Sequence, residues 1–169
     1  KNRGSVLLVR KGNPKRIAGA ADLARGDVRI FLSNPATETV SYEAYATTLR
    51  RIGARDGLDF RFLEAAPCPS PRVVYGECIH HREAPQSLAD DRADVAVVFY
   101  HLALRYTRIF PDWFEMIALT ANDDPAQVIS TVHIGLVGDG GEWGARLVEF
   151  MLSSDVAAAY RHHGLTPAQ

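Results

Sequence analysis

The feature that most constrains the fold is an unbroken run of apolar residues, VAVVF at 95–99. A strand with one face in water alternates apolar and polar residues, so an unbroken run predicts a strand covered on both faces. Other short apolar runs predict strands at 5–10, 28–32, 58–63, 114–119 and 129–137. Helical spacing of apolar residues predicts helices at 20–25, 41–52, 72–79, 85–91, 102–109, 142–152 and 155–162.

Strands that alternate with helices of this length predict an α/β fold around a mainly parallel sheet. The 169 residues are enough for about one domain with its own core, and 47% of them are apolar. A net charge of −1 gives the chain no overall positive potential to attract a phosphate backbone, so we expect no nucleic-acid partner. The absence of a GxGxxG or GxxxxGK[ST] loop disfavours nucleotide binding, and we expect no cofactor.

The stretch VYGECIHHREAP at 74–85 concentrates a thiol, two imidazoles, a guanidinium and two carboxylates. Adjacent His80 and His81 point to different sides of any regular backbone, and Cys78 is not placed to complete a tetrahedron with both. A zinc site is therefore the weaker interpretation, and we expect no metal. Cys68 and Cys78 are not a CxxC pair, and a single bridge between them stays open.

Four segments in order carry a family resemblance: VLLVRKGNPKRIAGAADLA at 6–24, VRIFLSNPATETVSYEAYATTLRRIG at 28–53, ADVAVVFYHLAL at 93–104, and ARLVEFMLSSDVAAAYRHHGLTPA at 145–168. Together they resemble the type 2 periplasmic binding protein family, especially its members for molybdate, tungstate and related small anions. The resemblance covers nearly the whole chain, although no single segment is specific.

This resemblance implies two lobes joined by two crossing strands, with the ligand between the lobes. Residues 6–10 would form the outgoing hinge strand and 129–137 would cross back. Residues 1–11 and 123–169 would then supply hinge strands and part of lobe 1, and residues 12–122 would form lobe 2. The roughly 80 residues that begin the family's first lobe have no counterpart here, so we expect lobe 1 to be incomplete.

The family's small-anion sites use backbone amides and hydroxyls at helix N-termini, which offer unpaired N–H groups and a partial positive charge. One such start is Glu38-Thr39-Val40-Ser41. There the hydroxyl of Thr39 or Ser41 either caps the helix or turns toward a ligand. We expect these residues to contribute to the ligand site.

The second helix start contains His81, Arg82 and Glu83. Aligned with the molybdate-binding pattern, His81 falls where the family presents a backbone amide. Phe99 falls where a ligand-contacting Tyr is usual, and Tyr100 follows one residue later, so either the register slips or the hydroxyl contact is lost. Arg82 and the imidazoles would add positive charge and donors; a structural junction is the alternative.

Four further side chains leave alternatives open. Glu38 and Glu83 would repel an oxyanion unless they coordinate its central metal, as the tungstate-type members are understood to do. If both line the cleft, a cationic or amphoteric solute competes; if they point outward, they are ordinary helix-start residues. His101 and Arg105 share a helix face and either contribute to the cleft or are structural.

The resemblance implies a solute-binding component of an ABC-type uptake system, periplasmic or extracytoplasmic in location. Its partners would be a small anionic solute and the transporter permease, with no direct membrane insertion. An effector-sensing domain of a transcriptional regulator is the alternative, since the same fold serves there. No G-x-S-x-G or H-E-x-x-H signature is present, so we expect no enzyme activity.

Overall fold

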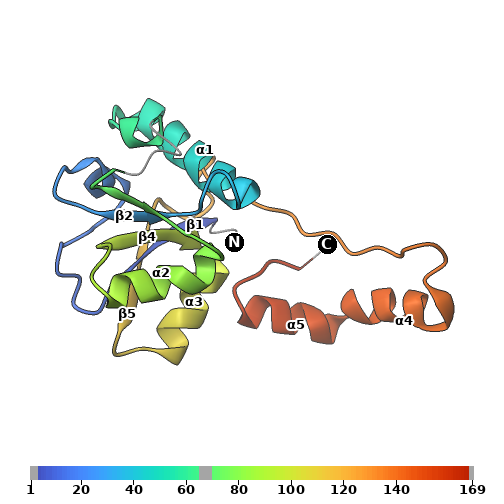
Figure 1. The fold of residues 1–169 in the computed structure, drawn as a ribbon. Coiled ribbons are helices and arrows are strands. Elements are labelled where there is room, and N and C mark those ends of the chain that lie inside the picture. The colour runs from blue at the N-terminus through green and yellow to red at the C-terminus, as the bar shows by residue number, and fades with distance from the viewer. Residues whose placement is uncertain (1–3, 65–69, 168–169) are drawn as a thin grey trace.

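The computed structural model describes residues 4–64 and 70–167. Its centre is a five-stranded sheet in the order β3-β2-β4-β1-β5 (Figure 1). The strands are β1 (Ser5–Arg10), β2 (Ile30–Leu32), β3 (Val73–Tyr75), β4 (Val95–Phe99) and β5 (Phe114–Ala118). The helices are η1 (Ala20–Ala24), α1 (Thr39–Asp56), η2 (Arg61–Leu63), α2 (His80–Ala89), α3 (Tyr100–Ile109), α4 (Gly141–Met151) and α5 (Ser154–His162).

Most strands of the sheet run in one direction. β2 pairs parallel with both β3 and β4, whereas β1 pairs antiparallel with β4 and β5. β1 alone therefore runs against the other strands. The expected α/β fold with a mainly parallel sheet is confirmed, and the carboxyl ends of β2, β3 and β4 lie at one edge of the sheet.

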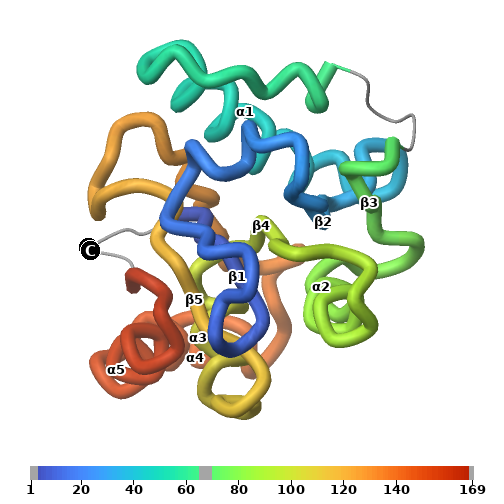
Figure 2. The backbone as a smooth tube through the Cα atoms, turned by 90° about the vertical axis from the view of Figure 1, so that its left-hand side faces the viewer, coloured from blue at the N-terminus to red at the C-terminus, as the bar shows by residue number. Residues whose placement is uncertain are grey.

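Helices cover both faces of the sheet, as Figure 2 shows with α1 on one side and α2 and α3 on the other. Val95 and Val97 of β4 join the core cluster that contains the buried side of α1. Ala96 and Val98 join the cluster that contains α2 and α3. The four β4 side chains are fully buried, as the unbroken apolar run predicts.

Two sequence predictions between α1 and α2 are wrong. Residues 58–60 have no regular structure and residues 61–63 form the short helix η2, because Asp59 accepts the Arg61 backbone N–H at 3.0 Å and Phe60 packs against Gly53. Residues 72–79 are not helical. Val73–Tyr75 forms an edge strand instead, because its β-branched and aromatic residues pair with β2.

Helix α2 begins at His80, before the predicted start at residue 85, and it contains Pro85. Proline has no N–H to donate to the carbonyl four residues earlier, which here belongs to His81. The Tyr106 hydroxyl of α3 donates to that carbonyl instead. A contact from another helix thus allows a sequence that usually ends a helix to continue one.

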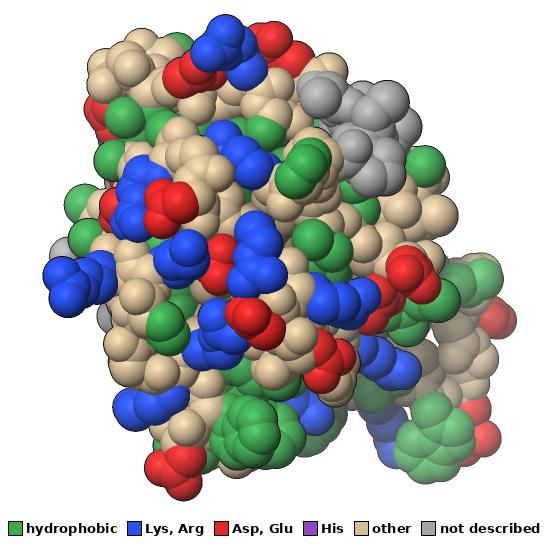
Figure 3. All heavy atoms as spheres, turned by 60° about the vertical axis from the view of Figure 1, so that its left-hand side comes forward, with side chains coloured by type: hydrophobic (Ala, Val, Ile, Leu, Met, Phe, Trp, Pro, Cys, Tyr) green, Lys and Arg blue, Asp and Glu red, His purple; other side chains and the backbone are tan. Residues whose placement is uncertain are grey.

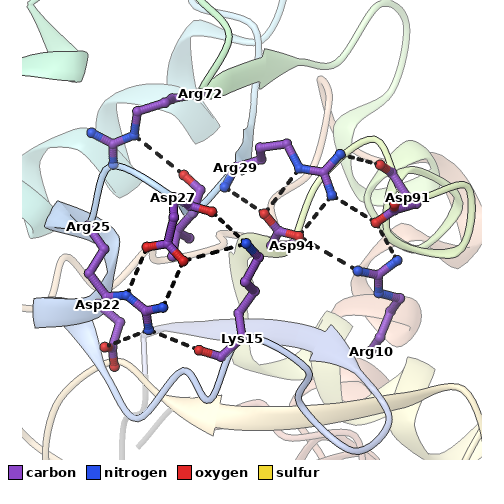
Figure 4. A network of polar contacts seen from close by, with 10 residues as sticks. Arg10, Lys15, Asp22, Arg25, Asp27, Arg29, Arg72, Asp91 and Asp94 are labelled. Atoms are coloured by element: carbon purple, nitrogen blue, oxygen red, sulfur yellow. Dashed lines mark hydrogen bonds and ion pairs between the residues drawn. The ribbon is translucent and has the colours of Figure 1, made fainter.

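The edge of the sheet opposite the helix starts carries a network of ion pairs (Figure 4). The Asp94 carboxylate, 4% exposed, accepts the Arg29 backbone N–H at 2.8 Å and two guanidinium N–H groups at 3.1 and 2.9 Å. Arg29 and Arg10 also pair with Asp91 at 2.8 and 2.6 Å. These contacts join the strands that flank β4 to the loop that precedes it.

The chain after residue 128 departs from the expected hinge strand. Residues 129–137 are exposed and form no strand, and no backbone hydrogen bond connects 129–136 to another described residue. The reason is that no strand of the described residues lies beside this segment. Helices α4 and α5 then follow one another beside the sheet, close to the predicted bounds (Figure 1), and the His162 carbonyl at the end of α5 accepts from the Arg108 guanidinium of α3 at 2.7 Å.

Candidate functional site

Three helices begin at the carboxyl edge of the parallel strands: α1 after β2, α2 after β3 and α3 after β4. This edge is the favoured ligand side of open α/β sheets. The Glu38 carboxylate before α1 accepts the His80 N–H of α2 at 2.8 Å. The two predicted helix starts, residues 38–41 and 80–83, are therefore neighbours.

The loop before α1 is shaped by Asn34. Its side-chain oxygen accepts the Ala36 N–H at 2.9 Å, and its side-chain nitrogen donates to the Gly76 carbonyl at 3.1 Å. The first bond forms the turn into the helix, and the second joins this loop to the one before α2. Sequence reasoning missed Asn34 as a site-forming residue, since Ser33-Asn34-Pro35 indicated only a loop.

At the start of α1, the Thr39 hydroxyl donates to the Pro35 carbonyl at 3.1 Å and so turns back toward its own loop. Val40 is 83% exposed. Ser41 is half-buried, and its hydroxyl has no hydrogen bond to a described residue. The backbone N–H groups of Thr39, Val40 and Ser41 likewise meet no acceptor within the described residues, so the first turn of α1 offers three unpaired donors.

The start of α2 is held by Glu83. Its carboxylate accepts the backbone N–H groups of Glu77, Cys78 and Ile79 at 2.7, 2.7 and 2.6 Å. Partial burial opposes ionisation, but the three donors outweigh it, and the pKa of Glu83 is lowered. Glu83 thus fixes the turn that leads into its own helix.

The two glutamates have similar partners. Glu38 and Glu83 each accept backbone N–H groups at the junction of the two helix starts. Within 4–64 and 70–167, neither carboxylate pairs with a cationic side chain. The two carboxylates leave one donor of this junction unused. The His81 backbone N–H meets no acceptor among the described residues, and His81 is half-buried.

A row of aromatic rings lies behind these helix starts. The His80 ring stacks on Phe31 with centroids 5.3 Å apart and lies 5.3 Å from Tyr45. Phe99 contacts Tyr45 at 4.7 Å and stacks on His101 at 6.0 Å. These rings come from β2, α1, α2, β4 and α3, so the row makes the helix starts one packed unit.

Burial keeps the imidazole of His80 neutral. His80 is 2% exposed, and desolvation, followed by the nearby His81, lowers its pKa to about 4. Its Nε2 atom is buried and has no hydrogen-bond partner among the described residues. Burial and His81 also lower the pKa of His101. His80 therefore serves as a packed ring at this edge, and His81 and His101 lie near each other.

The remaining predicted residues are more dispersed. Phe99, the last residue of β4, is half-buried, and the Tyr100 N–H donates to the Gly4 carbonyl at 2.9 Å. Tyr100 lines a hollow of about 470 Å³ with Asn122, Arg161 and the segment that follows α5. Arg82 and Arg105 are exposed, and neither forms an ion pair with another described residue.

Two other possibilities can be compared with the structure. Among the described residues, no group of three or more His, Cys, Asp or Glu side chains is arranged to hold a metal ion. Cys78 is exposed, whereas Cys68, its expected candidate partner, lies outside the described residues. In the same part of the chain no helix combines the length and apolarity needed to cross a membrane.

The sequence profile of the bacterial extracellular solute-binding proteins matches residues 2–166, almost the whole chain. The chain belongs to this family. No curated protein sequence matches this solute-binding protein.

Solved structures agree on the fold. PEB3 from Campylobacter jejuni is similar with a TM-score of 0.63 and 16% identity, over 98% of this chain and 66% of that one. PEB3 bound to L-phospholactate gives 0.61 and 17% over 98% and 66%. The "substrate binding domain of putative molybdenum ABC transporter" from Clostridium difficile gives 0.58 and 13% over 99% and 65%. The periplasmic-binding-protein fold is therefore confirmed, and this chain spans just under two thirds of the length of those proteins.

Proposed function

We propose that this chain is part of the solute-binding component of an ABC-type uptake system. It would act outside the cytoplasm and deliver a small anion, of the molybdate or tungstate kind, to a membrane permease. Family membership supports the solute-binding role. The uptake system, the location and the ligand class are inferences.

One observation carries the proposal for the ligand: two adjacent helix starts present unpaired backbone N–H groups at the edge where α/β sheets bind ligands. Thr39, Val40 and Ser41 would donate from α1 and His81 from α2. Such donors suit an oxyanion, because backbone N–H groups at a helix start offer partial positive charge and do not ionise as pH changes.

The other predicted residues would have supporting roles. Glu38 and Glu83 would fix the two helix starts, since their carboxylates are engaged by N–H groups. Arg82 would add long-range attraction for an anion. Phe99 and Tyr100 would border the ligand from the end of β4.

The division into lobes remains a proposal. Residues 12–122 would form lobe 2, and residues 1–11 and 123–169 would supply hinge segments and part of lobe 1. The length of the similar structures supports this division. So does the apolar surface of α4, where Trp143, Leu147 and Phe150 are 62%, 56% and 58% exposed. The ligand would then be held by closure of the two lobes.

A matched pair of variants at Thr39 tests the ligand site in the full-length protein. Thr39→Pro removes the N–H at the first helical position, where proline fits, and Thr39→Ala removes only the hydroxyl. Titration of molybdate, tungstate and sulfate by calorimetry should show binding to the wild-type protein, about tenfold weaker binding to Thr39→Pro, and nearly unchanged binding to Thr39→Ala. If none of these oxyanions binds the wild-type protein, the proposed ligand class is wrong.

A further inference from the structure

Gln127 is nearly buried although it belongs to no helix or strand. It is 8% exposed. Its side-chain oxygen accepts the Ser5 N–H at 2.8 Å, and its side-chain nitrogen donates to the Ser5 carbonyl at 2.9 Å. The same nitrogen donates to the Thr120 hydroxyl at 3.1 Å. One amide thus satisfies both backbone groups of a residue 122 positions earlier in the chain.

The two hydrogen bonds from the Gln127 amide to Ser5 have the pattern that a residue of a neighbouring antiparallel strand would make. On one side of β1, Ser5 pairs with Phe99 of β4. On the other side, the β5 ladder ends at the pair Val6 and Ala118, so no β5 residue faces Ser5. Gln127 takes this place and extends the pairing of β1 by one residue. Without it, two buried backbone groups of Ser5 would lose their partner.

Further contacts anchor the segment around Gln127. The Asp124 carboxylate pairs with Arg55 of α1 at 2.8 Å. The Val128 N–H donates to the hydroxyl of Thr48, which is fully buried in α1, at 2.9 Å. Beyond Val128, the backbone of residues 129–136 makes no hydrogen bond with the described residues. The anchorage therefore ends between residues 128 and 129.

Gly4 connects this anchorage to the ligand edge. Its φ of 54° is in the left-handed region, and a Cβ there would lie 2.5 Å from the Gln127 side-chain oxygen. Only glycine allows the Gln127 amide to come so close. The Gly4 carbonyl in turn accepts the Tyr100 N–H at the start of α3.

We propose that Gln127 is a positioning residue that fixes the pivot of lobe movement. It binds the start of β1 to the segment that ends at Val128, so that both segments stay fixed to the sheet. Lobe movement would then bend the chain just before Ser5 and between residues 128 and 129. Through Gly4 it couples this pivot to the start of α3, where Tyr100 lies. The proposal rests on the proposed function, because it requires two lobes that move.

The test uses Gln127→Met, which keeps the length of the side chain and removes its two hydrogen bonds to Ser5 and the one to Thr120. Gln86→Met is the matched control, since Gln86 is exposed on α2 and its side chain bonds Asp90 of the same region, far in sequence from Ser5. In the full-length protein without ligand, hydrogen exchange of the Ser5 amide should accelerate at least tenfold in Gln127→Met, while Leu7 and Leu8 of the same strand stay protected. Thr48→Val, which removes the other anchor, should accelerate exchange of the Val128 amide in the same way.

A second readout follows lobe movement directly. Spin labels at Arg50→Cys on α1 and Glu149→Cys on α4, with Cys68 and Cys78 replaced by Ser, report the distance between the lobes. Gln127→Met should broaden this distance distribution, whereas Gln86→Met should not. Together with the protection of Leu7 and Leu8, this readout separates a pivot from general destabilisation, because general destabilisation would accelerate exchange at those amides as well.

The outcomes distinguish this inference from the ligand proposal. Faster Ser5 exchange with a broader distance distribution supports the pivot even if molybdate and tungstate fail to bind the wild-type protein. Unchanged Ser5 exchange and an unchanged distribution in Gln127→Met overturn the pivot even if those oxyanions bind. If Gln127→Met does not fold, Gln127→Ala gives the same readouts, because the shorter side chain also removes the hydrogen bonds to both backbone groups of Ser5.

Discussion

At the scale of single residues, the carboxylate of Glu83 and the imidazole of His80 show how side chains build the start of α2. Glu83 accepts three backbone N–H groups from the loop before the helix. His80 fills a buried position between Phe31 and Tyr45. Both residues were candidates for chemistry in the sequence, and both are occupied with holding the junction.

Replacing Glu83 should weaken this junction. In Glu83→Gln a neutral amide replaces the carboxylate, and we expect the free energy of unfolding at pH 7 to fall by about 1–3 kcal/mol. Because folding lowers the pKa of Glu83, this stabilisation is present above the ordinary value of 4.5 and is lost as pH falls through the folded value. Urea unfolding of wild type and variant should therefore differ at pH 7 and converge in acid.

The control is Glu77→Gln, because Glu77 is exposed in the same turn and only its backbone takes part in the Glu83 contact. We expect a change of less than about 0.5 kcal/mol there. Equal losses in the two variants would contradict the role assigned to Glu83.

His80 should give the protein a pH-dependent stability. Folding lowers its pKa from 6.5 to about 4, so the unfolded chain binds a proton in this interval that the folded chain does not. The free energy of unfolding should fall as pH decreases from about 6.5 to about 4, by up to about 3 kcal/mol. His80→Phe keeps the ring between Phe31 and Tyr45 and should reduce this slope.

The exposed His133 provides the control, and His133→Asn should leave the slope as it is in the wild-type protein. Denaturant unfolding at a series of pH values measures both variants. A slope that is the same in His80→Phe and in the wild-type protein would show that His80 does not titrate as described.

At the scale of elements, the sheet is held from both edges. The helix starts are joined at one edge by Glu38 and Asn34. At the other edge, Asp94 before β4 binds Arg29 before β2 (Figure 4). Over the face in Figure 3, basic and acidic side chains are interspersed, so surface charge here is organised in local pairs.

Breaking the Asp94 contact should cost far more than breaking an exposed one. Asp94→Asn removes the charge from a buried acceptor of three N–H groups, while Arg29 keeps its ion pair with Asp91, and we expect a loss of about 1–3 kcal/mol in the free energy of unfolding. Burial opposes ionisation of Asp94, but the Arg29 donors outweigh it and lower its pKa. The stabilisation is therefore present above pH 3.8, its ordinary value, and is lost below the folded one.

Asp27→Asn is the matched comparison, because the exposed Asp27 pairs with Arg25 at 2.9 Å. We expect a much smaller loss in this variant, because solvent screens an exposed ion pair. Thermal unfolding of the two proteins side by side measures the difference. A similar loss of stability in both variants would mean that the burial of Asp94 does not strengthen its contribution to the free energy of unfolding.

At the scale of the whole molecule, the apolar side of α4 is left uncovered by the described residues. Neither α4 nor α5 has a buried residue in the described structure. Trp143, Leu147 and Phe150 follow one another at helical spacing on α4 and are more than half exposed. Our lobe proposal places the rest of lobe 1 on this surface.

Leu147→Gln should therefore act differently in two contexts. In the 169-residue chain it should change the free energy of unfolding by less than about 0.5 kcal/mol, since Leu147 is 56% exposed. In the full-length protein, where lobe 1 would cover Leu147, we expect a loss of about 2–5 kcal/mol. Chemical unfolding of both forms measures the change, with Glu149→Gln as the exposed control. A negligible loss in the full-length protein would place lobe 1 elsewhere.

The sequence alone determined the elements whose own patterns are strong. The apolar run at 95–99 became the fully covered strand β4, and the spacing and joint of the last two helices predicted α4 and α5 closely. Local propensity and hydrophobic period suffice there, because both are carried by the residues of the element itself. Family order along the chain similarly predicted the fold.

Tertiary structure decided the rest, because the deciding partners are distant in sequence. Val73–Tyr75 is a strand through its pairing with β2, and α2 continues past Pro85 with help from Tyr106. Glu38 meets His80 across 42 positions, and Gln127 meets Ser5 across 122. No periodicity records such contacts, since each depends on how separate elements pack. The pattern at 129–137 shows the converse: a strand sequence stays unpaired where no described strand lies beside it.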